Sequence, residues 1–473
     1  MKVQLLTEYV NKNFNDLNKA FSLEINDSSF KENPFLRIYM IYEKEDVVAY
    51  LSFYHEYEKV EIENIEVLEE YRKKGYGSIL MDELISFCKR EKIENITLEV
   101  NELNDSAIRL YEKFDFKKVS IRKGYYDGID GILMERKIAM KDTYILGIES
   151  SCDETSVSIV KNGCEEIATV VLSQIDIHKN YGGVVPEIAS RNHVKNITMV
   201  IEECLDKANM SMDLIDAIAV TYGPGLIGSL LVGLEAAKTL SFVYQKPLVP
   251  VHHIMGHIYA NNLVKPLEFP LICLVISGGH TELVLMDKHL SFKKLGSTLD
   301  DAVGECYDKV ARVIGVSYPG GPVIDKMAHE GNNNYKLPIP LDDNSYNFSF
   351  SGLKSAVINL VHNEEQRGNE INKEDLATSF QNVVVETLTK KTMKALKEYN
   401  VNNLIVAGGV AANKGIREEL TELCEKNNIN LSFPEMKYCT DNAAMIAAVG
   451  YFLYKDGKTS TLELNSKSTS ELK

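Results

Sequence analysis

Short apolar segments that run directly into glycine-rich loops are the feature of this 473-residue chain that most restricts its fold. Residues 271–276 lead into Ser277-Gly278-Gly279, and residues 404–407 lead into Gly408-Gly409. A strand that ends in a glycine turn and leads into a helix is a building unit of α/β proteins. The pattern therefore predicts an α/β fold for the larger part of the chain.

A separate α/β pattern lies N-terminal to these segments. Strands are expected at residues 37–42, 47–54 and 60–67, followed by a glycine turn and a helix over about residues 76–92. The apolar side chains of this helix recur at spacings of three and four and share one face: Leu80, Leu84, Phe87 and Cys88.

The two patterns meet between residues 137 and 143, where one strand pattern has ended and a new one begins at Tyr144. We therefore expect a first domain over residues 1–140 and a second over residues 141–456. Two or three cores are well within reach of a chain of this length. Residues 457–473 are rich in Lys, Ser and Thr, which predicts a polar, solvated tail.

Composition restricts the classes of function. The chain has 52 basic and 68 acidic residues, a net charge of −16, so a nucleic-acid substrate would need a local basic patch or a basic partner. Eight cysteines without a C-x-x-C pair fit reduced thiols in a cytosol. The first residues lack the apolar core of a signal peptide, and prolines interrupt the longest uncharged stretches. We expect no membrane segment and a cytoplasmic protein.

The glycine turn of the first domain could hold a pyrophosphate. Residues 72–78, Arg-Lys-Lys-Gly-Tyr-Gly-Ser, lie between a strand and an amphipathic helix, where backbone amides and the positive helix end favour anions. Alone, so short a pattern is more often an ordinary turn with solvated basic residues. A strand at residues 97–100 and a helix at residues 107–114 follow it and strengthen the functional interpretation.

In this order the segments resemble the GNAT acetyltransferases, most closely the RimI-like enzymes that acetylate a ribosomal protein N-terminal alanine, over nearly all of residues 1–140. The resemblance implies acetyl-CoA as acetyl donor, with Glu99 as base on the amine and Tyr111 as acid toward the departing thiolate. A carboxylate can take a proton from an α-amine of pKa near ~8, and a phenol of pKa near ~10 can protonate a thiolate. The residues expected to hold acetyl-CoA are Arg72, Gly75, Gly77, Ser78 and Asn104.

Alternatives stay open for this domain. Glu99 could be an exposed strand residue and Tyr111 a helix-packing residue, in a module that binds acetyl-CoA without a peptide substrate. Asp115 stands where the family usually has glycine, and Asp tolerates a positive φ better than most residues.

In the second domain, His253 and His257 are four residues apart, so on a helix both imidazoles can reach one metal ion. Histidines at this spacing also cap and pack. A zinc peptidase would need Glu directly after the first histidine, and Ile254 stands there. The peptidase interpretation is therefore disfavoured.

Further polar loops follow apolar segments along the second domain, at residues 147–156, 181–187, 221–230, 275–281, 300–308, 318–325, 348–354, 407–413 and 438–445. Together and in order, they resemble the tRNA threonylcarbamoyladenosine transferase family, TsaD, over about residues 142–454. The resemblance implies the two-lobed fold of actin, with nucleotide in the cleft. It also implies one iron or zinc ion held by His253, His257 and Asp441.

By the same resemblance, the substrate threonylcarbamoyl-AMP would contact a set of loop residues: Val275, Ile276, Ser277, Gly278, Gly279, Asp308, Gly321, Asp325 and Asn413. Glu154 is the candidate for handling the amine proton or orienting the substrate, although it could be a simple turn residue. The expected acceptor is the exocyclic amine of the tRNA adenosine 3′ of the anticodon. A TsaB-like paralogue and a TsaE-like ATPase are the expected protein partners.

The sequence thus predicts a bifunctional enzyme that joins tRNA threonylcarbamoyl transfer to N-terminal protein acetylation. The alternative for the second domain is a nucleotide-dependent scaffold or chaperone-like ATPase with a structural metal.

Overall fold

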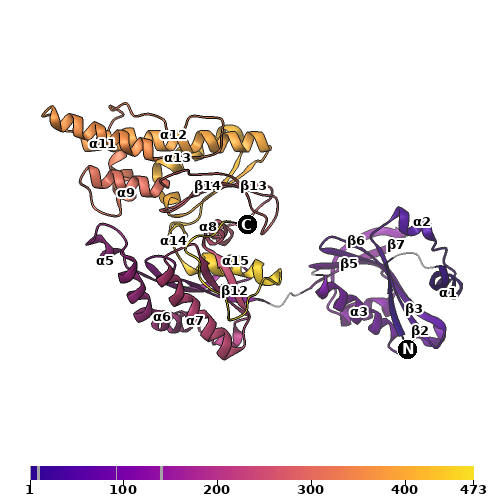
Figure 1. Cartoon of the computed structure of the whole chain (residues 1–473). Coiled ribbons are helices and arrows are strands. Elements are labelled where there is room, and N and C mark those ends of the chain that lie inside the picture. Colours follow the sequence, from indigo (N-terminus) through magenta and orange to yellow (C-terminus); the bar gives the residue numbers. More distant parts are fainter. Residues whose placement is uncertain (1, 8–10, 92, 139–141, 473) are drawn as a thin grey trace. The chain divides into compact units, whose positions relative to one another are not determined.

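The computed structural model describes residues 2–7, 11–91, 93–138 and 142–472. The chain divides into two compact units, residues 1–141 and 142–473 (Figure 1). The boundary expected between residues 140 and 141 lies outside the described residues.

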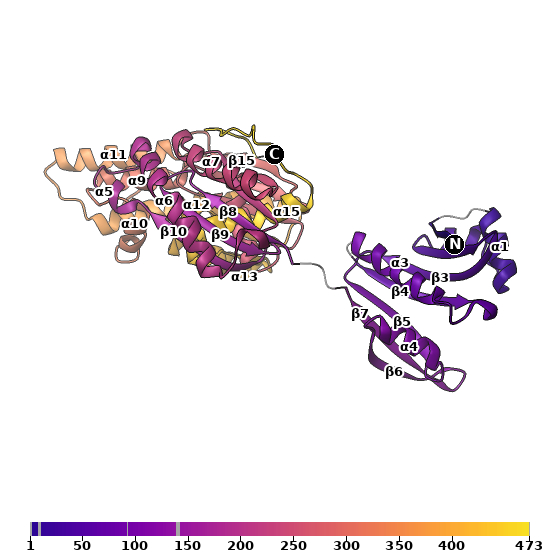
Figure 2. The same cartoon turned by 90° about the horizontal axis from the view of Figure 1, so that it is seen from below.

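The first unit is built on one twisted seven-stranded sheet with the strand order β1-β2-β3-β4-β5-β7-β6 (Figure 2). Its strands are β1 (Lys2–Leu6), β2 (Leu36–Glu43), β3 (Asp46–Glu56), β4 (Lys59–Val67), β5 (Asn95–Asn101), β6 (Lys117–Tyr126) and β7 (Ile129–Lys137). Its α-helices are α1 (Asn11–Phe21), α2 (Asp27–Glu32), α3 (Tyr76–Arg90) and α4 (Asp105–Lys113). The expected helix is α3, and the four apolar residues that define its face are buried.

Strands β4 and β5 form the one parallel pair of this described sheet, and their pairing is short. It runs from Lys59 opposite Asn95 to Ile62 opposite Leu98 and then stops. The two strands separate directly before Glu99, which leaves backbone groups and side chains accessible at this point of the sheet. The expected site of acetyl transfer therefore lies where two parallel strands part.

The second unit contains two five-stranded sheets with the same connectivity. One has the order β10-β9-β8-β11-β12 and the other the order β15-β14-β13-β16-β17. In each, three antiparallel strands are followed by two parallel ones. Two lobes of this topology form the actin-like fold, which confirms the predicted fold class.

The first lobe contains β8 (Tyr144–Glu149), β9 (Glu154–Lys161), β10 (Glu165–Ser173), α5 (Ile175–Lys179), α6 (Pro186–Ala208), β11 (Ala217–Gly223), α7 (Ile227–Tyr244), β12 (Leu248–His252) and α8 (His253–Tyr259). Alternate residues of β8 enter different cores: Leu146 and Ile148 pack with α6 and α7, whereas Ile145 packs with α15 (Ala443–Lys455). The sheet is therefore covered on both faces, and α6 and α7 lie side by side (Figure 1).

The second lobe contains β13 (Leu271–Ile276), β14 (Thr281–Met286), β15 (Lys293–Ser297), α9 (Val303–Val313), α10 (Gly320–Ala328), α11 (Ser351–Gln366), α12 (Lys373–Tyr399), β16 (Asn403–Ala407), α13 (Lys414–Asn427), β17 (Asn430–Ser432) and α14 (Met436–Cys439). β13 and β16 have the bounds that the sequence predicts to within one residue. One apolar core, shared by both lobes, surrounds α15 and α8.

By length and composition α7 alone among the described helices could cross a membrane, a test that core helices also pass. One face of α7 packs into the first lobe, where Leu230, Leu234 and Ala237 are buried.

The C-terminal residues that the sequence predicts to be a polar, solvated tail are mostly exposed, but they are also attached to the first lobe. Residues 460–472 lie along the first lobe: the Ser460 N–H donates to the Leu248 carbonyl and the Lys467 N–H donates to the Tyr222 carbonyl, both at 2.8 Å. Leu472 is buried in the shared core. Composition predicts the exposure of these side chains, but it does not reveal that the segment is attached through its backbone.

Candidate functional sites

The expected metal ligands come together from two distant parts of the chain. α8 begins at His253 directly after β12, so His253 and His257 lie one turn apart on the same face. Asp441 follows α14 and precedes α15. Its Oδ1 lies 3.5 Å from His253 Nε2 and 3.2 Å from His257 Nε2. The three possible ligand atoms lie within 4.8 Å of one another.

A fully buried carboxylate supports this group. Glu149, at the end of β8, accepts hydrogen bonds from the Ser151 N–H at 2.6 Å and the Thr221 hydroxyl at 2.7 Å. Its Oε2 also lies 3.2 Å from His253 Nδ1. A carboxylate that accepts from Nδ1–H leaves Nε2 free for a metal.

The charges of the cluster favour a cation. Burial would raise the pKa of Asp441, but His253 and His257 lower it to about 2. Burial would lower the pKa of His253, but Asp441 and Glu149 raise it to about 9. His257 Nδ1 is buried and has no hydrogen bond among the described residues. Two imidazoles and a carboxylate converge on one point, and such a set fits a three-ligand transition-metal site with open positions.

The three ligands line a cavity of about 560 Å³. Most of its wall comes from four loops: Ser151 and Cys152 after β8, Pro224 to Leu226 after β11, Ser277 to His280 after β13, and Ser468 to Ser470 near the C-terminus. Val184 and Tyr318 complete the lining. Of the residues expected to contact the substrate, Ser277, Gly278 and Gly279 line this cavity. Val275 and Ile276 are buried in β13 and do not.

A second cavity of about 390 Å³ shares Gly278 with the first. It is lined by Asp308, Gly321, Asp325 and Asn413, the remaining residues predicted to contact the adenylate. The two cavities therefore bring together, around Gly278, most of the residues that the sequence predicts for the metal and the nucleotide.

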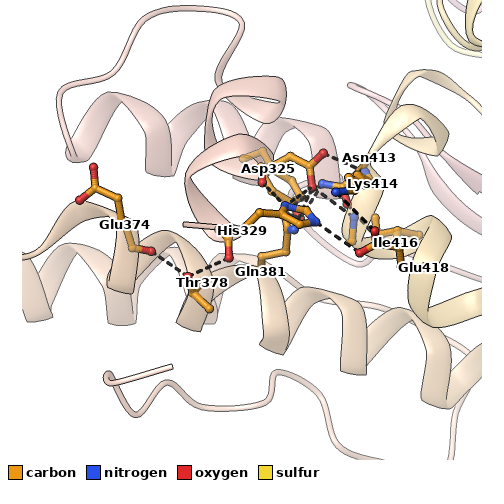
Figure 3. Close-up of polar contacts among 12 residues, drawn as sticks. Asp325, His329, Glu374, Thr378, Gln381, Asn413, Lys414, Ile416 and Glu418 are labelled. Carbon is orange, nitrogen blue, oxygen red and sulfur yellow. Dashed lines mark hydrogen bonds and ion pairs between the residues drawn. The ribbon is translucent and has the colours of Figure 1, made fainter. Parts of the chain in front are cut away.

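Asp325 and Asn413 are fixed by their neighbours (Figure 3). Asp325 Oδ2 accepts from the Lys414 N–H at 2.8 Å, and its Oδ1 accepts from Gln381 Nε2 at 2.9 Å. Asn413 caps α13 by accepting from the Ile416 N–H at 2.9 Å, and its Nδ2 donates to Gln381 Oε1 at 3.0 Å. Gln381 thus connects the two predicted contact residues.

Glu154 lies at the start of β9 and does not line either cavity. It is buried and accepts a hydrogen bond from the Ser173 hydroxyl at 3.1 Å. Burial first, and then the charges of Asp441 and Asp153, raise the pKa of Glu154 to about 10. In the metal-free protein at neutral pH this group is therefore a protonated acid.

In the first unit, Glu99 lies on β5 where β4 separates from it. Its Oε1 is 2.6 Å from Arg122 Nη1 of β6, and only 13% of its side chain is exposed. A hydrogen bond to Glu99 is the main cause that raises the pKa of Tyr125. The candidate base is thus surrounded by polar groups of the β6 strand.

Tyr111 lies on α4 and is buried beside Phe116, with ring centroids 5.8 Å apart. Burial raises the pKa of Tyr111 above its usual value, so the phenol is protonated at neutral pH. Asp115, at the end of α4, adopts a φ of 60°, as its place in a glycine position of the family predicts.

Four of the five residues expected to hold acetyl-CoA lie at or near the start of α3. The fifth, Asn104, lies at the start of α4. Gly75 precedes α3 with a φ of 92°, Gly77 packs against Leu110, and Ser78 Oγ accepts from Lys113 Nζ at 3.1 Å. Arg72 Nε donates to the Val67 carbonyl at 3.2 Å. Asn104 caps α4 by accepting from the Ala107 N–H at 3.1 Å.

Comparison with known proteins matches each unit separately. The model of the family described as tRNA N6-adenosine threonylcarbamoyltransferase matches residues 165–448. This chain belongs to that family. The acetyltransferase (GNAT) family model matches residues 4–116, so a GNAT domain precedes the transferase domain.

Individual members of the threonylcarbamoyltransferase family are very similar to this chain. The enzyme of that name from Staphylococcus saprophyticus is 64% identical over 324 residues, which is 68% of this chain and 95% of the relative. The one from Staphylococcus aureus is 60% identical over 333 residues, 70% of this chain and 98% of the relative.

Solved structures match both units at low identity. A ribosomal-protein alanine N-acetyltransferase from Escherichia coli is 21% identical with a TM-score of 0.26, covering 29% of this chain and 96% of that one. Component A of (R)-2-hydroxyglutaryl-CoA dehydratase from Acidaminococcus fermentans is 15% identical with a TM-score of 0.40, covering 66% of this chain and 98% of that one.

The sequence did not predict several residues that this threonylcarbamoyltransferase family member places around its cavities. Glu149 and Thr221 lie within motifs that the sequence does single out, but nothing in their spacing connects either to His253. Gln381 lies inside the long helix α12, where a polar residue has no signal of its own. The tail residues 468–470 follow the matched region, which ends at residue 448.

Proposed function

We propose that the second domain transfers the threonylcarbamoyl group from threonylcarbamoyl-AMP to the exocyclic amine of the tRNA adenosine 3′ of the anticodon. The observation that carries this proposal is the metal-ligand cluster of His253, His257 and Asp441, in a cavity that adjoins the cavity of Asp308, Asp325 and Asn413. A donor that is a mixed anhydride of a carbamic acid and AMP needs both a nucleotide pocket and a polarising site next to it.

The two cavities suggest how the donor lies. Asp308, Asp325 and Asn413 would bind its adenosine, and the backbone of residues 277–279 would hold its phosphate. The carbamoyl group then points toward the metal ligands. The amine nitrogen of the tRNA base bonds to the carbamoyl carbon, the bond from that carbon to the phosphate oxygen breaks, AMP leaves, and the amine loses one proton.

His253, His257 and Asp441 would hold one iron or zinc ion, which supplies a Lewis acid for the donor oxygens. Glu149 orients His253 for this task. We assign Glu154, which lies behind the cavity wall, the orientation of the substrate through Ser173 and the neighbouring loop.

We propose that the first domain acetylates the N-terminal amine of a protein, such as a ribosomal protein that begins with alanine, from acetyl-CoA. The opening between β4 and β5 beside Glu99 supports this function. The incoming amine would compete with Arg122 for Glu99, lose its proton to Glu99 directly or through water, and attack the thioester. Tyr111 would donate a proton to the CoA thiolate as it leaves.

Exposed apolar side chains on α6 and α7 support a protein partner for the second domain. Val194 of α6 and Phe242 and Val243 of α7 are more than 60% exposed, at 64%, 64% and 61%. Helices that lie side by side with such residues exposed are suited to pack against a similar helix pair. We propose a TsaB-like paralogue there, with a TsaE-like ATPase as a further partner, in the cytoplasm.

Nucleoside analysis by mass spectrometry tests the tRNA activity. The full chain is incubated with tRNA, iron or zinc, threonylcarbamoyl-AMP and the two partner proteins. Threonylcarbamoyladenosine should form, and its formation should require the ligand cluster. The scaffold alternative is favoured if the parent chain forms no modified nucleoside under these conditions and variants without the metal-ligand cluster still bind the partner proteins.

A further inference from the structure

The C-terminal segment, defined here as residues 460–472, is fixed to the first lobe beside the metal cavity. The Gly225 N–H donates to the Ser468 carbonyl at 3.2 Å, in addition to the contacts of Ser460 and Lys467 described above. Leu472 anchors the end of the segment, since it is only 8% exposed. The segment is therefore held at several points along its length.

The end of β11 leaves space for this segment. A Cβ atom added at Gly223 would lie 2.3 Å from the Lys467 carbonyl oxygen, a distance at which atoms cannot coexist. On the other side, His252 Nε2 lies 3.2 Å from the Ser470 carbonyl oxygen. His252 precedes the metal ligand His253 in the chain, so the segment is seated directly against the element that positions the ligands.

The segment contributes three hydroxyl-bearing residues to the lining of the metal cavity. Ser468, Thr469 and Ser470 line the same cavity as the metal ligands. Ser470 Oγ lies 3.5 Å from the Tyr222 hydroxyl. Across the described part of the chain, the hydroxyls of Ser468 and Thr469 have no hydrogen bond, so they are available to a ligand in the cavity.

The order of the cavities determines which part of the donor meets these hydroxyls. If the adenosine occupies the cavity of Asp325 and Asn413 and the phosphate lies near Gly278, the rest of the donor extends into the metal cavity. That remainder ends in a threonyl carboxylate and a threonyl hydroxyl. Serine and threonine hydroxyls can donate to the first and either donate to or accept from the second.

We propose that Ser468 and Thr469 bind the threonyl end of the donor and contribute to its selection. This inference rests on the function proposed for the second domain, and it extends the substrate site to a segment beyond the region that defines the family match. Because the two residues would contact only the donor, their loss should weaken donor binding without removing metal.

The test is the double variant Ser468→Ala/Thr469→Val of the full chain, with Ser466→Ala as control. Ser466 belongs to the same segment but does not line the cavity. We expect KM for threonylcarbamoyl-AMP to rise about tenfold or more, as for lost hydrogen bonds to a charged group, with kcat and metal content close to the parent. The control should match the parent.

A donor comparison separates binding of the threonyl end from a general effect on the fold. With glycylcarbamoyl-AMP, which lacks the threonyl side chain, the double variant should lose less than with the threonyl donor, so its preference between the two falls. An unchanged KM would overturn the proposal, and an equal loss for both donors would overturn selection of the threonyl side chain, because both donors carry the carboxylate.

Calorimetry with a stable sulfamate analogue of the donor, compared with AMP, repeats the test without turnover. The double variant should lose affinity for the analogue and keep its affinity for AMP. An inactive parent chain would count against the proposed function alone, whereas equal affinity of parent and variant for the analogue would overturn the role of the tail.

Discussion

At the residue scale, the metal site depends on a carboxylate that is not itself a ligand. Glu149 is fully buried, and its three neighbours, Ser151, Thr221 and His253, leave its oxygens no access to water. A carboxylate behind a histidine ligand fixes the orientation of the ring and raises its basicity. Glu149 is therefore a positioning residue whose effect must appear in metal affinity.

We expect Glu149→Gln to lower the affinity for iron or zinc by about 10- to 100-fold, since it keeps the shape but removes the charge. Competition with a chelator measures the affinity. Thr221→Val is the matched control, because it removes one hydrogen bond to Glu149 and leaves the charge, so its loss should be smaller. Equal affinities of parent and Glu149→Gln would show that Glu149 only packs.

Asp441, unlike Glu149, is itself an expected metal ligand, and it is the one carboxylate among the three. Asp441→Ala should reduce bound metal well below one ion per chain and remove threonylcarbamoyl transfer, with the fold retained. Elemental analysis and thermal unfolding of the same sample give both quantities. A variant with full metal content would contradict the assignment of this residue.

The raised pKa of Glu154 predicts that the stability of the metal-free protein depends on pH. Its pKa is about 10 in the folded state and near 4.5 when unfolded, so between these values only the unfolded state releases the proton. Its contribution to stability is therefore greatest below about pH 4.5 and is lost as pH rises toward about 10. Denaturant unfolding should show that Glu154→Gln loses less stability between neutral and alkaline pH than the parent. Parallel curves would mean that Glu154 is ionised in the folded state.

At the scale of elements, the sequence predicts what periodicity and glycine loops encode. The apolar face of α3, the limits of β13 and the single helix face of His253 and His257 follow from spacing alone. The C-terminal segment does not, because its polar side chains match a solvated tail while its backbone makes the contacts. Likewise, Gln381 meets Asp325 and Asn413 only when α12 packs beside α10 and α13.

The element that positions acetyl transfer is the opening between β4 and β5. Glu99→Gln should lower kcat/KM for peptide acetylation by about 10²- to 10⁴-fold near neutral pH, where most of the α-amine is protonated, and less at high pH. Affinity for acetyl-CoA should not change, because Glu99 is not among the residues expected to hold it. Tyr111→Phe should slow departure of the thiolate, with acetyl-CoA affinity retained as well. If both variants acetylate as fast as the parent at every pH, their assigned roles are wrong.

At the scale of the whole molecule, each predicted set of site residues is complete within one compact unit. Those for acetyl transfer lie before residue 141, and those for the metal and nucleotide lie after it. Among the described residues, each unit also has its own buried clusters. Units with separate cores generally fold alone.

We therefore expect the fragment of residues 1–140 to bind acetyl-CoA, and the fragment of residues 141–473 to bind metal and adenylate, each as the full chain does. The second fragment must keep the C-terminal segment, since a version that ends at residue 456 loses the backbone contacts at Tyr222, Gly225 and Leu248. Calorimetry on the two fragments and the full chain measures these affinities. A loss beyond about tenfold, roughly 1.4 kcal/mol, in either complete fragment would mean that the units depend on each other. If instead the fragment that ends at residue 456 binds the stable donor analogue as tightly as residues 141–473 do, the C-terminal segment is dispensable to the site. In that case its contact with Gly223 serves folding alone.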